Sequence, residues 1–246
     1  MVAIQPSIFN TPSVAVAPFN TAPSSATRFG SATRFGVAFP AHLQRNSDCV
    51  PTPPEVAQQM IDLLGIEPGM RVLEPSAGTG NIAGEVKKIS GVNLDVIELD
   101  ERLRQALRQQ GYHVVGNDFL THKGTQYDRI IMNPPFSKKG GPEPQSVMHI
   151  KHAYSMLKPG GKMAAILPDW IFRANKGRLQ KNFCQWLKDE TGVHTTYALA
   201  RGTFDNDESS TQVPTRILLI SKPGIAKKGK KQSKRTKFGN SLDLMA

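Results

Sequence analysis

The residues best suited to chemistry are Asn133, Pro134, Pro135 and Phe136, which directly follow the apolar run 127–132. Two consecutive prolines cannot continue a ladder of backbone hydrogen bonds, so a strand at 127–132 must end in a stiff loop. The Asn133 carboxamide oxygen can accept a hydrogen bond from an exocyclic amine, and the Pro134 carbonyl, which lacks a ladder partner, can be a second acceptor. Phe136 offers a flat face to a base removed from its stack. A proline-rich turn after a buried strand is the alternative interpretation.

A second set of residues predicts a nucleoside-binding site. Gly78, Gly80 and Ala83 follow a short apolar run at G-x-G-x-x-A spacing, which predicts a turn that brings bare backbone close to a ligand. Glu98 lies in another short strand, 20 positions after Gly78, where a carboxylate can hold ribose hydroxyls. Alone, this pair is typical of any nucleoside cofactor, NAD included.

Together, the run 73–80 (Leu-Glu-Pro-Ser-Ala-Gly-Thr-Gly) and the Asn-Pro-Pro-Phe tetrapeptide 133–136 resemble the S-adenosylmethionine-dependent adenine-N6 DNA methyltransferases over roughly residues 50–221. The resemblance implies S-adenosylmethionine as the cofactor, DNA as the partner and the exocyclic N6 amine of adenine as the methyl acceptor. It also implies that the tetrapeptide is the catalytic loop.

The same resemblance implies where the cofactor binds. Glu74 and Gly78 would lie beside its methionine part, and Glu98 would hold the ribose. Asp118 would bond the adenine amine while Phe119 packs against that ring. The complete set of implied cofactor-binding residues is Thr52, Glu74, Ser76, Gly78, Gly80, Asn81, Glu98, Leu99, Asp118 and Phe119.

Three further residues are expected on the substrate side. The family loop that matches 201–211 lines the target-base pocket with an aromatic residue, which implies Phe204, although a packing role for this ring is an equal alternative. Lys138 and Lys139 combine two cations with neighbouring glycines and can clamp a phosphate as the base swings out. A disordered connector is the alternative for that segment.

The chain departs from the family in one respect. Only 26 polar and basic residues follow the last apolar strand, 215–220, so we expect a small form without a target-recognition domain. The target sequence, a cognate nuclease and the oligomeric state are not indicated.

Other functions stay open beside this hypothesis. An RNA methyltransferase that modifies an adenine or guanine amine uses the same tetrapeptide chemistry. Protein glutamine methyltransferases carry a similar loop that ends in Tyr, whereas Phe136 favours a base. A non-catalytic nucleic-acid-binding protein is the alternative outside enzymology. An NAD dehydrogenase is the weakest rival, because no acid/base pair for hydride transfer is evident.

The order of elements predicts an α/β fold. Strands and helices alternate along the chain, which favours a parallel sheet with helices on both faces, and the two last strands form an edge hairpin. The ending resembles the methyltransferase fold, so we expect a Rossmann-like, seven-stranded, mostly parallel sheet with a C-terminal antiparallel hairpin. The predicted strands are 71–74, 94–99, 113–115, 127–132, 162–167, 195–199 and 215–220. The predicted helices are 53–64, 81–88, 100–110, 145–157 and 176–188.

Composition divides the chain into three parts. Residues 1–47 have no acid, are rich in Ser, Thr, Ala and Pro, and repeat the hexamer Ser-Ala-Thr-Arg-Phe-Gly, which predicts a disordered tail. Residues 48–221 would form the catalytic domain, and 222–246 a basic disordered tail. Eight lysines and arginines without an acid lie in 222–237, so most of the net charge of +11 is outside the domain. Such an arm suits nonspecific phosphate binding, and a solubility tail is the alternative.

The remaining features bound the compartment and exclude some classes. Cys49 and Cys184 are too far apart in sequence to indicate a disulfide framework or a zinc site, and His149 with His152 lacks a third ligand, so we expect no metal and surface histidines. No apolar run approaches the ~20 residues of a membrane span. A cytoplasmic protein is expected, or an organellar one if residues 1–47 are a transit peptide.

Overall fold

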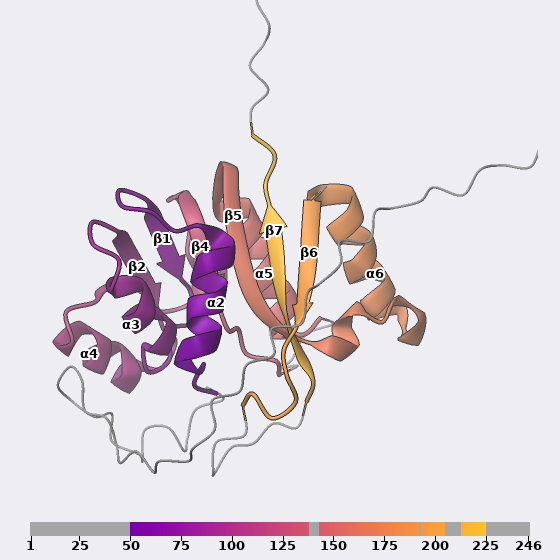
Figure 1. The fold of residues 1–246 in the computed structure, drawn as a ribbon, viewed down its shortest axis with the longest axis horizontal. Helices are drawn as coiled ribbons and strands as arrows, with labels where there is room; N and C mark the ends of the chain where they lie inside the picture. The colour runs from indigo at the N-terminus through magenta and orange to yellow at the C-terminus, as the bar shows by residue number, and fades with distance from the viewer. Residues whose placement is uncertain (1–49, 138–142, 192, 205–212, 225–246) are drawn as a thin grey trace, which may run out of the picture. The chain divides into compact units, whose positions relative to one another are not determined.

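A computed structural model describes residues 50–137, 143–191, 193–204 and 213–224. These residues form one seven-stranded sheet in the order β3-β2-β1-β4-β5-β7-β6, flanked by helices (Figure 1). This arrangement confirms the predicted Rossmann-like α/β class. The predicted N-terminal tail, 1–47, lies outside the described residues, as does nearly all of the predicted C-terminal tail.

The elements fall close to their predicted places. The strands are β1 Arg71–Glu74, β2 Asn93–Ile97, β3 His113–Gly116, β4 Tyr127–Met132, β5 Leu157–Pro168, β6 Val193–Ala198 and β7 Thr215–Ser221. The α-helices are α2 Pro54–Leu64, α3 Asn81–Lys87, α4 Glu101–Gln109, α5 Gln145–Met156 and α6 Arg178–Trp186. Short 3-10 helices are η1 Phe119–Thr121, η2 Asp169–Phe172 and η3 Ala174–Lys176, and a π-helical turn, Leu187–Thr191, follows α6.

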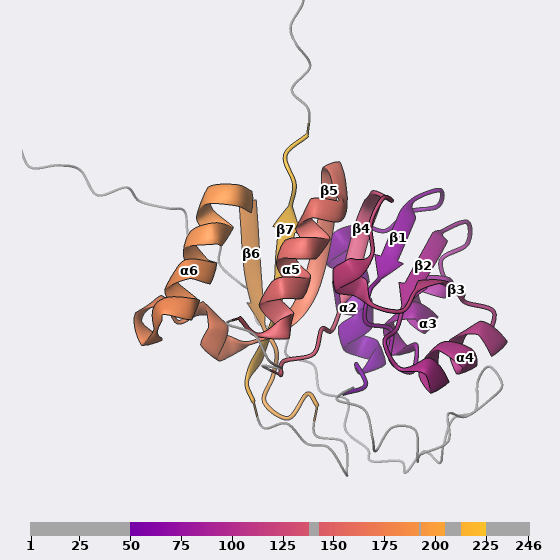
Figure 2. The same cartoon turned by 180° about the vertical axis from the view of Figure 1, so that it is seen from behind.

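Alternating side chains divide the core into two layers. In β4, Ile130 and Met132 pack with apolar residues of α5 and α6, whereas Ile131 between them packs with α2 and α3. This follows from the two-residue period of a strand, which sends neighbouring side chains to opposite faces. Figures 1 and 2 show the result, with α2 in front of the sheet in one view and α5 in front of it in the other.

The C-terminal strands close the sheet on one side. β7 pairs antiparallel with both β5 and β6, so it lies between them and β6 forms the edge. β1 to β5 pair in parallel, as predicted. β5 is longer than expected, because Leu157 already pairs with Tyr127 and the Lys-Pro-Gly-Gly segment belongs to the strand rather than to a preceding turn.

A polar cluster around the buried Asp95 connects the strands near their amino ends, away from their carboxyl ends. The Asp95 carboxylate accepts hydrogen bonds from Arg71 Nη2 at 2.9 Å and from Tyr127 Oη at 3.0 Å. It also lies 2.7 Å from His113 Nδ1. Asp95 is 4% exposed, and burial alone would raise the pKa of its carboxyl group. The hydrogen bonds from His113, Arg71 and Tyr127 outweigh burial and hold this pKa below its usual range. One carboxylate thereby connects β1, β2, β3 and β4.

The carboxyl ends of the parallel strands meet at one edge of the sheet, where the order reverses. After β1 the chain continues through β2 and β3 on one side, and it returns to the other side of β1 as β4, which pairs Leu73 with Ile130. Such a reversal leaves a crevice outside the strand ends, where ligands bind in open α/β sheets. The loops after Glu74 and after Met132 therefore start beside each other.

Candidate functional site

The amide of Asn133 is held in one orientation by the chain that precedes α2. Asn133 Nδ2 lies 3.2 Å from the Val50 carbonyl oxygen and 3.2 Å from Thr52 Oγ1. A carbonyl oxygen can only accept, so the amide nitrogen must face this side and the amide oxygen the other. Thr52 itself is 3% exposed, so the bond forms in a shielded place. The group that the sequence predicted to accept an amine is thus oriented to accept.

The rest of the Asn-Pro-Pro-Phe loop is anchored on both sides. Pro134 is buried, and Phe136 is half-buried against the α2 face of the core. Beyond it, the Ser137 carbonyl accepts a hydrogen bond from the Gln145 backbone N–H at 3.1 Å, and the Ser137 hydroxyl donates to Gln145 Oε1 at 3.1 Å. These two hydrogen bonds to the first residue of α5 fix where the loop ends. Lys138 and Lys139 lie outside the described residues.

The glycine turn and the acid after β2 are joined by direct bonds. The Gly78 N–H donates to Glu98 Oε2 at 2.6 Å, and the Asp100 N–H donates to Glu98 Oε1 at 2.9 Å. Gly78 and Gly80 have φ angles of 54° and 82°, in the left-handed region that favours glycine. A Cβ on Gly80 would also come within 3.1 Å of Leu107. The carboxylate predicted to hold ribose is therefore positioned by the loop predicted to hold the methionine part.

Glu74 is a buried carboxyl group with one oxygen unpaired. It is 1% exposed, and Oε2 has no hydrogen-bond partner within the described part of the chain. Burial raises its pKa well above the usual value, nearby Glu98 raises it further, and a bond from the Ala83 backbone only partly offsets this. A buried acid of this kind fits a cationic ligand, which would supply the missing partner and favour the ionised form.

His149 belongs to this site, although the sequence predicted a surface histidine. That prediction is wrong: His149 is 8% exposed, and its Nδ1 lies 3.3 Å from Ser76 Oγ in the glycine loop. Its ring meets the Phe119 ring edge-on at 5.3 Å. Burial lowers the pKa of His149 to about 4, so the imidazole is neutral at pH 7. Its position on the inner face of α5 was the available signal, because three apolar residues of the same stripe are buried with it: Val147, Ile150 and Ala153.

The remaining predicted residues lie at the same edge with different exposure. Asp118 accepts from the Leu120 N–H at 2.9 Å and so begins η1, which leaves its second oxygen for a ligand. Leu99 follows Glu98 and is 69% exposed, so its side chain is accessible as an apolar contact for a ring. Asn81 is exposed at the start of α3. Phe204 is 5% exposed and packs in the α2 layer of the core, in agreement with the packing alternative.

Neither a metal site nor a membrane-spanning helix is found in the part of the chain that the structure describes. Within the described ranges, no group of three or more His, Cys, Asp or Glu side chains is placed to hold a metal ion. No helix among those same residues has the length and hydropathy to cross a membrane. Cys184 is half-buried, which raises its pKa, while Cys49 lies outside the described residues.

Known proteins of similar sequence transfer methyl groups. The type II restriction enzyme and methyltransferase RM.BcgI of Heyndrickxia coagulans is 27% identical over 221 residues, which cover 78% of this chain and 33% of that protein. The tRNA (guanine(6)-N2)-methyltransferase of Thermus thermophilus is 29% identical over 130 residues, which cover 46% of this chain and 38% of the other. The chain thus spans little more than a third of the length of these relatives.

Solved structures and a family description agree with the observed fold. A Listeria monocytogenes protein, solved as a candidate class I S-adenosylmethionine-dependent methyltransferase, superposes with a TM-score of 0.59 at 17% identity, over 77% of this chain and 67% of that one. The family model described as methyltransferase small domain matches residues 57–185, just over half of the 246 residues. The chain therefore belongs to the methyltransferase small domain family, whose cofactor is S-adenosylmethionine.

Proposed function

We propose that this protein transfers the methyl group of S-adenosylmethionine to the exocyclic N6 amine of adenine in DNA. The observation that carries the proposal is the fixed orientation of Asn133, whose Nδ2 donates to Val50 and Thr52 while its oxygen faces away from them. An acceptor held in this way selects a ligand that donates, and an amine on a planar ring is such a ligand.

The Glu74 and Glu98 loops are the proposed cofactor site. Glu74 is buried, and one of its oxygens has no partner among the described residues, so it fits the positive charge at the methionine end. Glu98, already oriented by Gly78 and Asp100, retains lone pairs for ribose hydroxyls. When bound, the cofactor supplies an electrophilic methyl group on sulfur.

The proposed reaction is a direct displacement that the protein aligns. The amine donates hydrogen bonds to the Asn133 oxygen and the Pro134 carbonyl, which turns its nitrogen lone pair toward the methyl carbon. The nitrogen–carbon bond forms as the carbon–sulfur bond breaks, its electron pair stays on sulfur, and the surplus amine proton leaves to water. Holding two reactants in line can remove roughly 7–11 kcal/mol of barrier, so the loop needs no strong base.

The target adenine must leave its stack before it can reach this loop. An N6 amine inside a duplex is paired and shielded, so the base must be flipped out or already single-stranded. Phe136 stays half-buried against the core, which leaves part of its ring to support the base. Base–aromatic stacking contributes roughly 1–3 kcal/mol.

Substitution of Asn133 tests the function. Asn133→Ala removes the acceptor, so we expect tritium incorporation from labelled S-adenosylmethionine into duplex DNA to fall by at least about 100-fold. Calorimetric affinity for the cofactor should be unchanged. Asn133→Asp is the comparison variant: it keeps an oxygen toward the amine but loses the hydrogen bond to the Val50 carbonyl, so it should retain more activity than Asn133→Ala and less than the wild type. A substantially active Asn133→Ala variant would refute the role of the loop.

RNA is the second candidate substrate, because one of the two relatives above is a tRNA methyltransferase. The same assay on a structured RNA distinguishes the two. Incorporation into RNA but not into DNA would show that the methyl acceptor is an amine of an RNA base rather than of adenine in DNA. The proposed role of Asn133 would stay the same. A protein that binds no S-adenosylmethionine would contradict both candidates.

A further inference from the structure

An exposed tryptophan follows β5, the strand that pairs with β4 ahead of the proposed target loop. Trp170 belongs to the 3-10 helix η2, which follows β5 directly, and it is 36% exposed. The next residue, Ile171, is fully buried, and Phe172 packs against the α5 and α6 layer of the core. The turn is thus anchored by its apolar neighbours while the indole remains at the surface.

The turn is also fixed on its polar side. The Asp169 carboxylate accepts from Arg173 Nη2 at 2.9 Å and from Arg216 Nε, and the Asp169 N–H donates to the Pro214 carbonyl at 2.7 Å. These bonds hold the pKa of Asp169 below its usual range, with Arg216 as the main cause and Arg173 as the second. Two guanidinium groups share one carboxylate, so the corner keeps an excess positive charge beside the indole ring.

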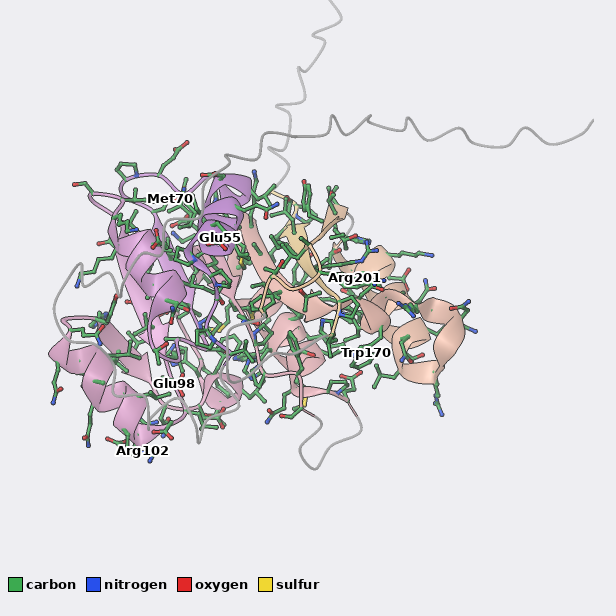
Figure 3. The ribbon with its side chains drawn as sticks, turned by 60° about the horizontal axis from the view of Figure 1, so that its bottom comes forward. Glu55, Met70, Glu98, Arg102, Trp170 and Arg201 are labelled. Carbon is green, nitrogen blue, oxygen red and sulfur yellow. The ribbon has the colours of Figure 1, made fainter. Side chains whose placement is uncertain are left out.

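The position of this corner follows from the strand register. Met132 pairs with Ala165, so Asn133 is level with Ile166, four residues before Trp170. Strand spacing then puts Trp170 roughly 10–15 Å from Asn133, a few nucleotides away at roughly 3.4 Å per stacked step. Figure 3 shows Glu98 among the earlier elements, in violet and pink, and Trp170 toward the later ones, in salmon and orange.

A second exposed apolar side chain belongs to the same corner. Val213 is 40% exposed and directly precedes Pro214, the acceptor for Asp169. From Pro168 to Lys181 the sequence has one acid, Asp169, and four cations. An aromatic face with an apolar neighbour and surplus positive charge fits a nucleobase with its phosphate.

We infer that Trp170 stacks on a base of a single DNA strand, a few nucleotides from the target adenine. Bases inside a duplex have both faces covered, so a stacking side chain favours unpaired or locally opened DNA over fully paired DNA. This inference deepens the proposed function and rests on it for the location of the target base. It adds a preference for single-stranded substrate that the target loop alone does not dictate.

Tryptophan fluorescence provides a direct test, because the chain has only two tryptophans, Trp170 and Trp186. Trp186 is stacked on Phe183 at 6.0 Å, and Phe can replace it conservatively. In the full chain carrying Trp186→Phe, a 16-nucleotide single strand of DNA that contains adenine should quench the remaining emission. In Trp170→Phe the same strand should leave the emission unchanged. This titration needs neither cofactor nor turnover, so it can succeed even if the proposed methyl transfer fails.

Kinetics provide the second measurement. Trp170→Ala should raise KM for single-stranded DNA roughly 5- to 150-fold, the loss expected for one stacked base, with kcat and cofactor affinity unchanged. Trp170→Phe should recover part of the loss, because it keeps an aromatic face. Val193→Ala is the matched control, since Val193 is 65% exposed at the start of β6, away from the target loop, and its KM should equal that of the wild type.

Three results would overturn the inference. The first is an unchanged KM in Trp170→Ala together with normal methyl transfer, which would leave the proposed function intact. The second is the absence of quenching when the strand is bound. The third is quenching by an RNA of the same sequence but not by DNA, which would assign the surface to RNA.

Discussion

The Asn133 amide is oriented by two hydrogen bonds to residues far away in sequence. Its partners Val50 and Thr52 lie 83 and 81 positions earlier in the chain. The sequence predicted the chemical group from its place after a strand, because Pro134 and Pro135 must end that strand. The orientation of the amide could not be predicted in this way, since it depends on a segment that only the folded sheet brings near.

Removing the Thr52 oxygen should release the amide. Thr52→Val keeps the shape but takes away one acceptor, so Asn133 can rotate and offer its nitrogen to the base. A net hydrogen bond contributes about 1 kcal/mol, so we expect kcat to fall roughly fivefold. Steady-state methyl transfer with Thr52→Ser as the control checks this, because Ser keeps the oxygen. Equal losses in Val and Ser variants would argue against the role of this bond.

Glu74 gives a prediction about pH. Its pKa is raised in the folded protein by burial, so its protonated form stabilises the fold at low pH, and this contribution is lost as pH rises through the folded pKa. Glu74→Gln cannot ionise. We therefore expect the cofactor-free variant to melt higher than the wild type at pH 8, with the difference shrinking as pH falls toward 4.5.

Thermal melts across pH, with and without S-adenosylmethionine, measure this effect. The cofactor should stabilise the wild type more than the variant, because only the wild type offers a full negative charge. A variant that melts lower than the wild type at every pH would show that Glu74 is not destabilised by its burial.

At the scale of elements, α5 links the two halves of the site. Its first residue, Gln145, holds the end of the target loop through Ser137, and one turn later His149 contacts Ser76 in the glycine loop. A shift of this helix would displace both loops together. The sequence predicted this helix at 145–157, and the structure has it at Gln145–Met156.

The burial of His149 predicts acid sensitivity. Its folded pKa of about 4 lies below the ordinary 6.5, so its contribution to stability is present above 6.5 and is lost as pH falls toward 4. Full protonation would cost on the order of 3 kcal/mol of unfolding free energy. The charge of nearby Asp118 opposes this lowering of the His149 pKa, and nearby His152 adds to it.

Replacing His149 with a side chain that cannot ionise should remove this sensitivity. His149→Asn keeps a polar group near Ser76, so its unfolding free energy should depend less on pH than that of the wild type between 6.5 and 4. Urea titrations at several pH values measure the unfolding free energy of the variant and of the wild type. Parallel pH profiles for the two proteins would contradict the assignment.

Most elements were predictable because each carries its own periodicity, and the exceptions have physical causes. β5 begins at Leu157 rather than at Lys162 because Tyr127 pairs with it across the sheet, a partnership that local sequence does not reveal. Helix α6 ends at Trp186 in a π-helical turn, where Thr191 Oγ1 donates to the Leu187 carbonyl at 2.6 Å. The first difference arises from a tertiary interaction, whereas the second accompanies a local hydrogen bond between residues four apart in sequence.

For the whole molecule, charge is distributed unevenly between the domain and the chain beyond it. Seven cations lie between Ala226 and Phe238, past the described residues, and they account for much of the net charge of +11. Lys222 lies among the described residues, and its Nζ donates to the Leu157 carbonyl at 2.7 Å. Gly224 is the last described residue, so a truncation there removes the seven cations and keeps the described fold.

Truncation after Gly224 should weaken DNA binding without changing the chemistry. Each phosphate that the shortened chain no longer neutralises reduces the slope of log affinity against log salt by roughly 0.9 on duplex DNA. We expect a shallower slope, weaker binding at low salt and an unchanged kcat. Fluorescence anisotropy over a range of salt concentrations measures the slope, and an identical slope for both chains would show that these cations do not bind phosphate.

The fixed orientation of the Asn133 amide also determines which bases the pocket excludes. A base that carries a keto oxygen where adenine has its amino group, such as thymine, uracil or hypoxanthine, would set one lone pair against another. The Val50 carbonyl, which can only accept a hydrogen bond, opposes the amide flip that would relieve this repulsion. Deamination of the target adenine would therefore convert a substrate into a molecule that the site repels.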